Sequence, residues 1–201
     1  MYKLICSFFL AFLFYIGVHA ADVAHIDNIR TAQKAKQALL FCEQKGYNTG
    51  YCILIDMSLH SGAKRFILWD LKRHRITLSG LVSNGCGSNT WSGTWGRDKP
   101  TFSNADGSHC TALGKYRIDS RAYSQWGIHV KYYLIGLEST NSNAYKREIV
   151  FHSWEKVSED VVYPNGTPEG WGCPAISNNV MTKVDALLRK QKKHTLLWIY
   201  N

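Results

Sequence analysis

Apolar residues recur at three- and four-residue spacing in two stretches of the chain, which is the pattern of a helix with one buried face. In the first stretch, residues 25–46, Asp27 or Asn28 can cap the start and Gly46 the end. The second stretch, residues 177–190, begins with a serine and an asparagine, either of which can cap it. The inward-facing positions are predicted to be Ile26, Ile29, Ala32, Ala35, Leu39 and Cys42 in the first helix, and Val180, Val184 and Leu187 in the second.

Short apolar or alternating runs between these helices predict strands. About seven strands and two helices in mixed order, with no βαβ repeat, predict a mainly β (α+β) domain with the helices packed outside. Residues 83–110 are rich in glycine, serine, asparagine and tryptophan and are predicted to form a long ordered loop beside the functional site. The predicted strands are residues 51–57, 66–70, 75–82, 114–118, 132–138, 147–152 and 195–200.

The apolar run at the N-terminus indicates a targeting segment and not a helix or strand of the domain. Residues 1–20 combine Lys3, an apolar stretch and the small-residue sequence Val18-His19-Ala20, the pattern of a cleaved signal peptide. The alternative is an uncleaved membrane anchor, for which this run is short, since a spanning helix needs about 20 apolar residues. We therefore expect residues 21–201 to form a single exported domain, located in the periplasm or cell envelope or secreted, with no membrane contact after cleavage.

The cysteine count changes once the signal peptide is removed. Cys6 leaves with it and five cysteines remain, so at least one thiol is unpaired within the monomer. Disulfides persist in an oxidising compartment. Spacing along the chain favours bridges Cys42–Cys52 and Cys86–Cys110, which would leave Cys173 free. A pairing that includes Cys173 and frees another cysteine is the alternative.

The chain is basic, with a formal net charge of +9. A positive surface attracts anionic polymers. For an exported chain, an acidic cell-wall or surface polymer is a better match than nucleic acid, so no nucleic-acid partner is expected.

Cys173 and His152 are the best candidates for chemistry. Cys173 lies in a glycine-flanked turn, residues 170–174, and His152 ends a strand-like run. A thiol needs a nearby base to act as a nucleophile at neutral pH, because the thiolate is the reactive form. We predict an acyl-transfer enzyme in which the N–H groups of Gly172 and Cys173 stabilise an oxyanion. A cysteine that bridges a dimer, or an inert buried thiol, is the alternative.

Other chemical classes find little support in the sequence. There is no HExxH motif, no pair of CxxC motifs and no glycine-rich phosphate loop, so neither a metal nor a cofactor is expected. His109, in the predicted loop, either binds substrate or is an ordinary hydrogen-bonded loop histidine. Several tryptophans between residues 69 and 171 can line a groove, although core packing explains each of them singly.

Several motifs together resemble one family. Residues 171–175, Trp-Gly-Cys-Pro-Ala, match the active-site motif of a branch of the murein L,D-transpeptidase catalytic-domain (YkuD-like) family. Residues 102–104 (Phe-Ser-Asn) and 107–109 (Gly-Ser-His) match a second segment of that branch. Residues 111–116 and the region from Asn143 to Ser158 also fit, so the resemblance covers nearly the whole mature chain.

The resemblance implies a β-sandwich or barrel with an N-terminal helix and a helix after the cysteine. It also implies an exported acyltransferase acting on peptidoglycan stem peptides, with Cys173 as nucleophile and His152 as base. The nucleophile attacks the position-3 carbonyl and releases terminal D-Ala. An amine then gives a 3–3 crosslink, or water gives L,D-carboxypeptidase activity. Ser108, His109 and Trp171 are the implied substrate-binding residues.

The chain departs from the family pattern at a few positions. Ser153 replaces the glycine that usually follows the histidine, and Glu169 stands where the branch often has arginine. Ala175 replaces the arginine of the wider family. Altered acceptor choice, or hydrolysis instead of crosslinking, would follow from such changes. Two alternatives remain: a non-catalytic, disulfide-stapled protein that binds a cell-wall polymer or host surface, and a cysteine protease acting on proteins.

Overall fold

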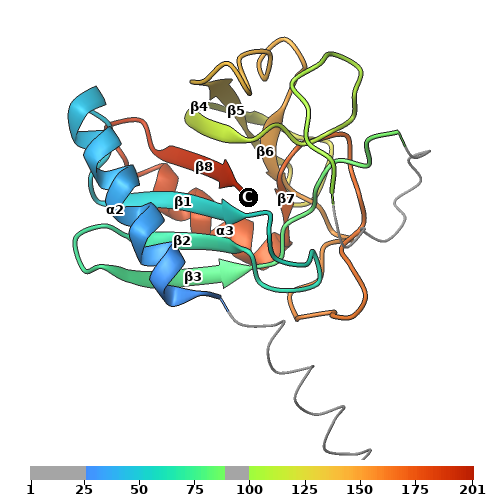
Figure 1. Ribbon diagram of the computed structural model, residues 1–201, viewed down its shortest axis with the longest axis horizontal. Helices are drawn as coiled ribbons and strands as arrows, with labels where there is room; N and C mark the ends of the chain where they lie inside the picture. Colours follow the sequence, from blue (N-terminus) through green and yellow to red (C-terminus); the bar gives the residue numbers. More distant parts are fainter. Residues whose placement is uncertain (1–25, 89–99) are drawn as a thin grey trace, which may run out of the picture.

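A mixed eight-stranded sheet curls into a nearly closed barrel in the computed structural model of the protein, which describes residues 26–88 and 100–201 (Figure 1). The strand order is β3-β2-β1-β8-β4-β5-β6-β7, and neighbouring strands are antiparallel except for the parallel pairs β1–β8 and β6–β7. The strands are β1 (Tyr51–Asp56), β2 (Phe66–Asp70), β3 (Arg75–Gly80), β4 (Gly114–Tyr123), β5 (Val130–Gly136), β6 (Val150–Ser153), β7 (Ala175–Ile176) and β8 (Leu196–Tyr200).

The two edges of the sheet meet just beyond β3. Val82 forms an isolated antiparallel bridge with Ile176 of β7, and the N–H of Ser83 donates to the carbonyl of Ala175 at 2.9 Å. The Ser83 hydroxyl also approaches the carbonyl oxygen of Cys173 at 3.4 Å. The seam that closes the barrel therefore lies directly beside the predicted nucleophile.

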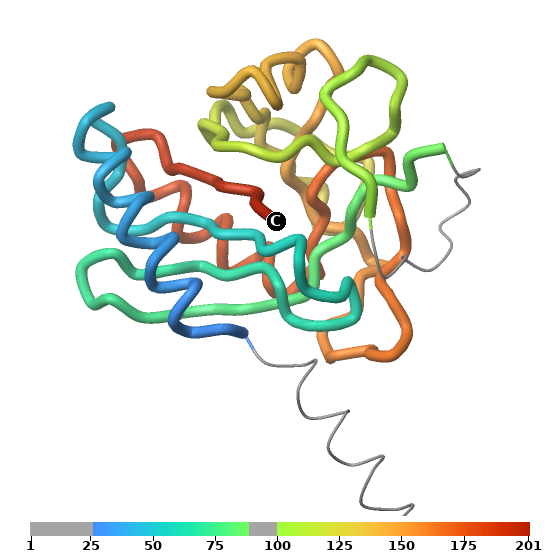
Figure 2. Tube along the Cα trace, viewed as in Figure 1, coloured from blue at the N-terminus to red at the C-terminus, as the bar shows by residue number. Residues whose placement is uncertain are grey.

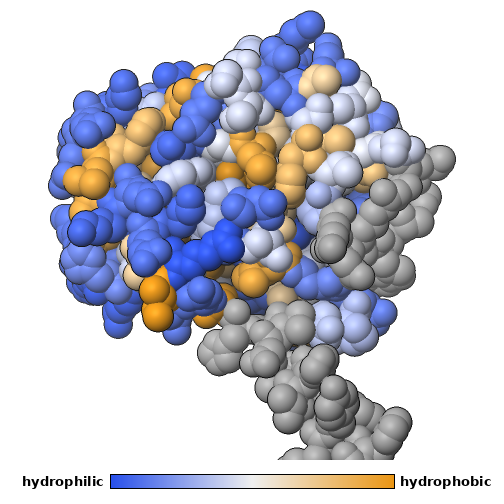
Figure 3. Space-filling model, in the orientation of Figure 1, coloured by the Kyte–Doolittle hydropathy of each residue, from blue (hydrophilic) through white to orange (hydrophobic). Residues whose placement is uncertain are grey.

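Helix α2 (Asn28–Lys45) covers one face of the sheet and has the predicted caps. The Asp27 carboxylate accepts from the N–H groups of Ile29 and Arg30, and Gly46 adopts a left-handed conformation with φ of 69°. The buried side of α2 consists of small residues that pack against β1, β2 and β8, whereas the predicted inward positions Ile29 and Ala32 are exposed. The face of the molecule that carries α2 is mostly hydrophilic, with scattered apolar groups (Figure 3).

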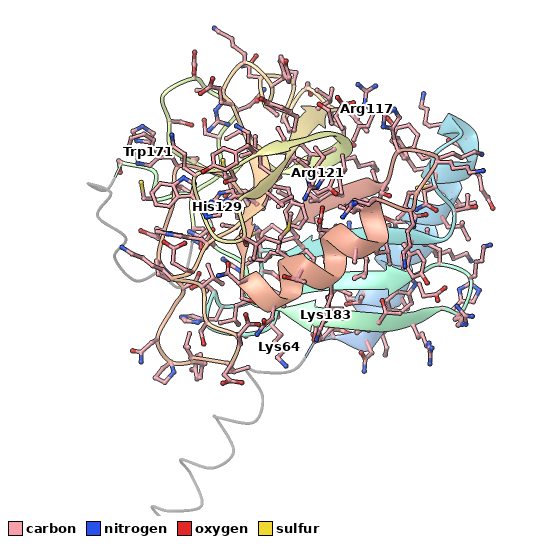
Figure 4. All side chains as sticks on the ribbon, turned by 180° about the vertical axis from the view of Figure 1, so that it is seen from behind. Lys64, Arg117, Arg121, His129, Trp171 and Lys183 are labelled. Atoms are coloured by element: carbon pink, nitrogen blue, oxygen red, sulfur yellow. The ribbon has the colours of Figure 1, made fainter. Side chains whose placement is uncertain are left out.

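Helix α3 (Asn178–Leu188) covers the opposite side of the sheet, so α2 and α3 enclose the β1–β3 region between them (Figures 1 and 4). Val180 and Val184 of α3 are buried in the main core cluster. Ser177 makes no side-chain cap; the Glu159 carboxylate accepts from the Ser177 hydroxyl at 2.7 Å and from the Asn179 N–H at 2.9 Å. A carboxylate from a distant loop thus caps this helix.

The predicted mainly β fold with two outer helices is confirmed, and all the predicted strands except residues 66–70 occur with one or both ends shifted. Strand β6 begins at Val150 and not at residue 147, because Glu148 has φ of 56° and the preceding residues form turns. The two-residue strand β7 was not predicted. No helix within residues 26–88 and 100–201 is long and apolar enough to cross a membrane. The predicted signal peptide, residues 1–20, lies outside the described residues.

The prediction of two disulfides is wrong: neither Cys42–Cys52 nor Cys86–Cys110 is bridged. Cys42 on α2 and Cys52 in β1 share the apolar cluster beneath α2. Burial raises the pKa of the Cys42 thiol to about 12 and also raises that of Cys52. Both thiols pack as small hydrophobic side chains, a common role for buried cysteine.

Candidate active site

The structure brings Cys173 and His152 to the same cleft, which has a volume of about 530 Å³. His152 lies in β6 opposite Ala175 of β7, and Cys173 precedes β7 by two residues. The short parallel β6–β7 pair is therefore what places the two catalytic candidates together. The cleft is also lined by Ser83, Tyr123, Ser124, Gln125, Trp126, Lys131, Glu148, Val150, Trp154, Gly170, Trp171 and Ala175.

The Cys173 thiol sits against the backbone at the start of β6. The Val150 N–H donates to Cys173 Sγ at 3.4 Å, and the carbonyl oxygen of Glu148 lies 3.8 Å from the same sulfur. Burial raises the pKa of Cys173; the Val150 N–H and the positive charges of Arg147 and Lys131 oppose this change. At neutral pH the thiol is therefore protonated until a base removes its proton.

The ring of His152 is buried and is oriented by a backbone carbonyl. Nδ1 lies 2.9 Å from the carbonyl oxygen of Ser153, and because a carbonyl only accepts, we assign the proton to Nδ1. Nε2 then carries the free lone pair of a base. Burial lowers the pKa of His152, the Lys131 charge lowers it further, and the Ser153 carbonyl and Glu155 oppose the change. The ring is therefore neutral at pH 7, as a general base requires.

These opposite pKa changes predict the pH dependence of thiol reactivity. With the thiol pKa above its ordinary value of 9.0 and the imidazole pKa below 6.5, the resting pair is neutral. The rate of Cys173 alkylation by iodoacetamide should rise continuously with pH to beyond pH 9, with labelling assigned by peptide mass spectrometry. The other described cysteines are buried and serve as internal controls. A plateau reached below pH 7 would instead demonstrate a preformed thiolate–imidazolium pair.

Gly172 allows a close backbone contact that holds the turn carrying Cys173. Its φ is 102°, and a Cβ atom there would lie 2.5 Å from the carbonyl oxygen of Cys110. The glycine thus approaches a neighbouring loop, whereas the sequence predicted approach to a substrate. Among the described residues, no hydrogen bond is donated by the N–H of Gly172 or Cys173. Both N–H groups keep the donor capacity that an oxyanion site needs.

Arg147 ties the loop before β4 to the nucleophile region. Its guanidinium donates to the carbonyl of Ser103 at 2.9 Å, to the hydroxyl of Ser108 at 3.2 Å and to the carbonyl of Cys110 at 2.7 Å. Figure 2 shows this loop running beside the turns that precede β6, where Asn104 makes further hydrogen bonds. Ser108 is therefore a loop residue held by Arg147 and does not line the cleft.

Of the three predicted substrate-binding residues, only Trp171 lines the cleft. Its side chain is 58% exposed, at the outer edge of the molecule in Figure 4. His109 stacks on Trp171, with ring centroids 4.9 Å apart and an interplanar angle of 19°. His109 therefore supports the cleft wall from behind.

Ser153, a departure from the family pattern, shapes another wall of the cleft. Its hydroxyl accepts from the N–H of Ile128 at 3.0 Å, and a Cβ on Gly127 would lie 2.1 Å from that hydroxyl oxygen. The hydroxyl thus anchors the β4–β5 turn. That turn presents Trp126, which packs edge-on against Trp154 at 6.1 Å. The sequence did not single out Trp126 or Trp154 individually; the abundance of tryptophan was the available signal.

Glu169, another departure, faces the interior. The residue is 2% exposed, and its carboxylate accepts a hydrogen bond from the side-chain amide of Asn84 at 3.5 Å. The Asn84 carbonyl accepts from the Gly170 N–H at 2.9 Å, and the fully buried Arg65 donates to Asn84 Oδ1 at 2.7 Å. This buried network holds the chain that leads into the turn carrying Cys173.

Within residues 26–88 and 100–201, no group of three or more histidine, cysteine or acidic side chains is arranged to hold a metal ion.

Comparison with known proteins identifies the family. The L,D-transpeptidase catalytic domain model matches residues 23–200, and no curated relative matches the chain. Among solved structures, an L,D-transpeptidase from Xylanimonas cellulosilytica aligns with a TM-score of 0.41 and 15% identity over 80% of this chain and 68% of that one. The helical cell shape determining protein Pgp2 from Campylobacter jejuni aligns with a TM-score of 0.49 and 12% identity over 77% of this chain and 49% of that one.

The family match extends over nearly the whole chain, and the protein belongs to the L,D-transpeptidase catalytic domain family. This confirms the resemblance recognised in the sequence motifs. Members of this family act on peptidoglycan.

Proposed function

We propose that the protein is an exported cysteine acyltransferase that acts on peptidoglycan stem peptides, as an L,D-transpeptidase or L,D-carboxypeptidase. The observation that carries the proposal is a thiol and a neutral imidazole of fixed tautomer facing one cleft. The +9 net charge suits a polymer rich in carboxylates. The periplasm or cell envelope is where such a substrate is met.

In the proposed reaction, His152 Nε2 removes the proton of Cys173 as Sγ attacks the carbonyl of residue three in the stem. The N–H groups of Gly172 and Cys173 donate to the developing oxyanion. When the tetrahedral intermediate collapses, the C–N bond to D-Ala breaks and His152 returns the proton to the leaving amine. The product is free D-Ala and a thioester on Cys173.

The thioester is resolved by a second nucleophile that gives its proton to His152. An amine of a neighbouring stem produces a 3–3 crosslink, and water produces a tripeptide. The cleft is open to solvent on the side of the half-exposed Trp171, where an acceptor can approach. Which acceptor reacts is a property of that outer wall, formed by Trp171 and the β4–β5 turn.

The proposal is tested with the chain from Ala21 onward and purified tetrapeptide muropeptides, with Cys173→Ser alongside. Mass spectrometry of products should show D-Ala release with a tripeptide or a 3–3 dimer, and intact-protein spectra should show a peptide thioester on Cys173. Casein serves as the control for general proteolysis. Muropeptide binding without any turnover would establish the non-catalytic binding protein, and casein cleavage without muropeptide turnover would establish a protease.

A further inference from the structure

One row of residues runs across three neighbouring strands beside the nucleophile. Lys131 of β5 is paired with His152 of β6, which is paired with Ala175 of β7. Side chains at paired positions of adjacent strands point to the same face of a sheet. All three residues line the cleft, so Lys131 flanks His152 on the side away from β7.

The charge of Lys131 has no carboxylate partner in the described part of the chain. The side chain is half-buried, and no acidic oxygen of residues 26–88 and 100–201 lies within 4.0 Å of its ammonium. Within the described residues, its ammonium lies over the ring of Tyr133, with the ring centroid 5.2 Å from Nζ. Desolvating a charge without a partner is unfavourable, and a ligand carboxylate would relieve that cost.

The rest of the cleft agrees with a carboxylate at this position. The opposite charge, Glu148, belongs to the segment before β6, where its carbonyl touches Cys173. Positive and negative groups thus stand in different parts of one cleft, which gives a zwitterionic peptide a preferred direction. The apolar faces of Trp126 and Trp154 adjoin this region and can pack on the aliphatic parts of the same peptide.

We propose that Lys131 is a specificity-determining residue that binds a carboxylate of the substrate peptide next to the scissile bond. This inference rests on the proposed function. A stem peptide offers two such groups: the C-terminal carboxylate of the departing residue, and the side-chain carboxylate of a diaminodicarboxylic acid at position three. The chemistry recognised is the same, and the substrates described below separate the two sources.

Lys131 also influences the two reacting groups electrostatically. Its positive charge lowers the pKa of both Cys173 and His152. The other charges that act on this pair are Arg147 and Glu148 on the cysteine and Glu155 on the histidine. Loss of the Lys131 charge should therefore raise the pKa of both groups.

The test compares Lys131→Met, which keeps the shape but removes the charge, with Lys131→Arg, which keeps the charge. Lys183→Met is the matched control, since Lys183 is exposed on α3, far from Trp171 in Figure 4. The substrates are a diaminopimelate tetrapeptide, its C-terminal carboxamide, and the tetrapeptide with L-lysine at position three. Protection of Cys173 from iodoacetamide measures binding of each peptide independently of turnover.

Lys131→Met should lower kcat/KM for the acidic tetrapeptide by about 10- to 100-fold, mainly through KM, as expected for loss of a charge-assisted hydrogen bond. Lys131→Arg should retain most of the kcat/KM of the unsubstituted protein, and Lys183→Met should retain all of it. For the peptide that lacks the recognised carboxylate, Lys131→Met should not lower kcat/KM. The pH at which alkylation of Cys173 is half-maximal should also move upward in Lys131→Met.

Equal effects of Lys131→Met on all three peptides, or no effect on KM and protection, would overturn the carboxylate assignment. If the unsubstituted protein turns over none of the peptides, the proposed function fails, but protection of Cys173 still tests Lys131. In that case, protection by the acidic tetrapeptide that is lost in Lys131→Met supports the inference, and protection unchanged by the substitution contradicts it.

Discussion

Replacing Cys173 with alanine is expected to lower kcat/KM for muropeptides by at least about 10⁴-fold, because the substitution removes the thiol that is proposed to form the acyl intermediate. Removal of a half-buried thiol leaves little empty space, so the free energy of unfolding should change by only about 1 kcal/mol. Steady-state release of D-Ala and thermal unfolding of the same preparation measure the two effects. A large activity loss with an unchanged midpoint identifies Cys173 as the nucleophile.

Cys42→Ala is the matched control for this substitution. Cys42 is a buried thiol on the inner face of α2, in the apolar cluster on the other side of the sheet from the main core. Its removal should cost some stability through a small cavity and leave kcat/KM unchanged. Retention of more than about 1% of the activity in Cys173→Ala would show that a different group forms the intermediate.

Substitution of His152 by glutamine is expected to lower kcat/KM by about 10²- to 10⁴-fold, the usual range for loss of a general base. A glutamine amide can still donate to the Ser153 carbonyl that the imidazole contacts at 2.9 Å, so the local geometry is largely kept. It cannot accept and return a proton. The acidic limb of the pH profile, which reports deprotonation of His152 below its ordinary pKa of 6.5, should disappear.

His194→Gln provides the control for this second prediction. The His194 ring also contacts a backbone carbonyl, that of Ile118 at 3.3 Å, but His194 does not line the cleft. Its substitution should leave kcat/KM and the pH profile unaltered. An acidic limb that persists in His152→Gln would assign that limb to another titrating group and remove His152 from the role of base.

Local features of this protein could be predicted well because they depend on neighbouring residues. The Asp27 cap and the left-handed Gly46 bound α2 as predicted, since both act within one or two turns of helix. Strand β2 has the predicted ends, Phe66 and Asp70, because its short apolar run is bounded by turn residues. Strand β7 was missed, since two residues carry no periodicity and the strand exists only through its pairing with β6.

The departures from the family pattern have structural roles that the neighbouring sequence does not reveal. Ser153 and Glu169 could be read from the chain only as unexpected residues. In the folded protein, the Ser153 hydroxyl holds the β4–β5 turn, and Glu169 belongs to a buried network with Asn84 and Arg65. The proposed disulfides failed for a related reason, because spacing along the chain does not reveal that Cys42 and Cys52 pack as apolar groups.

The sequence by itself determined most of the elements and the family, and it singled out Cys173 and His152 as candidates, because these are properties of short segments and their composition. Only the tertiary structure decided what surrounds that pair. Closure of the barrel through Val82 and Ile176 and the β5–β6–β7 register bring together residues more than forty positions apart, including Lys131 and Cys173. Register and closure depend on packing between distant strands, which no local pattern specifies.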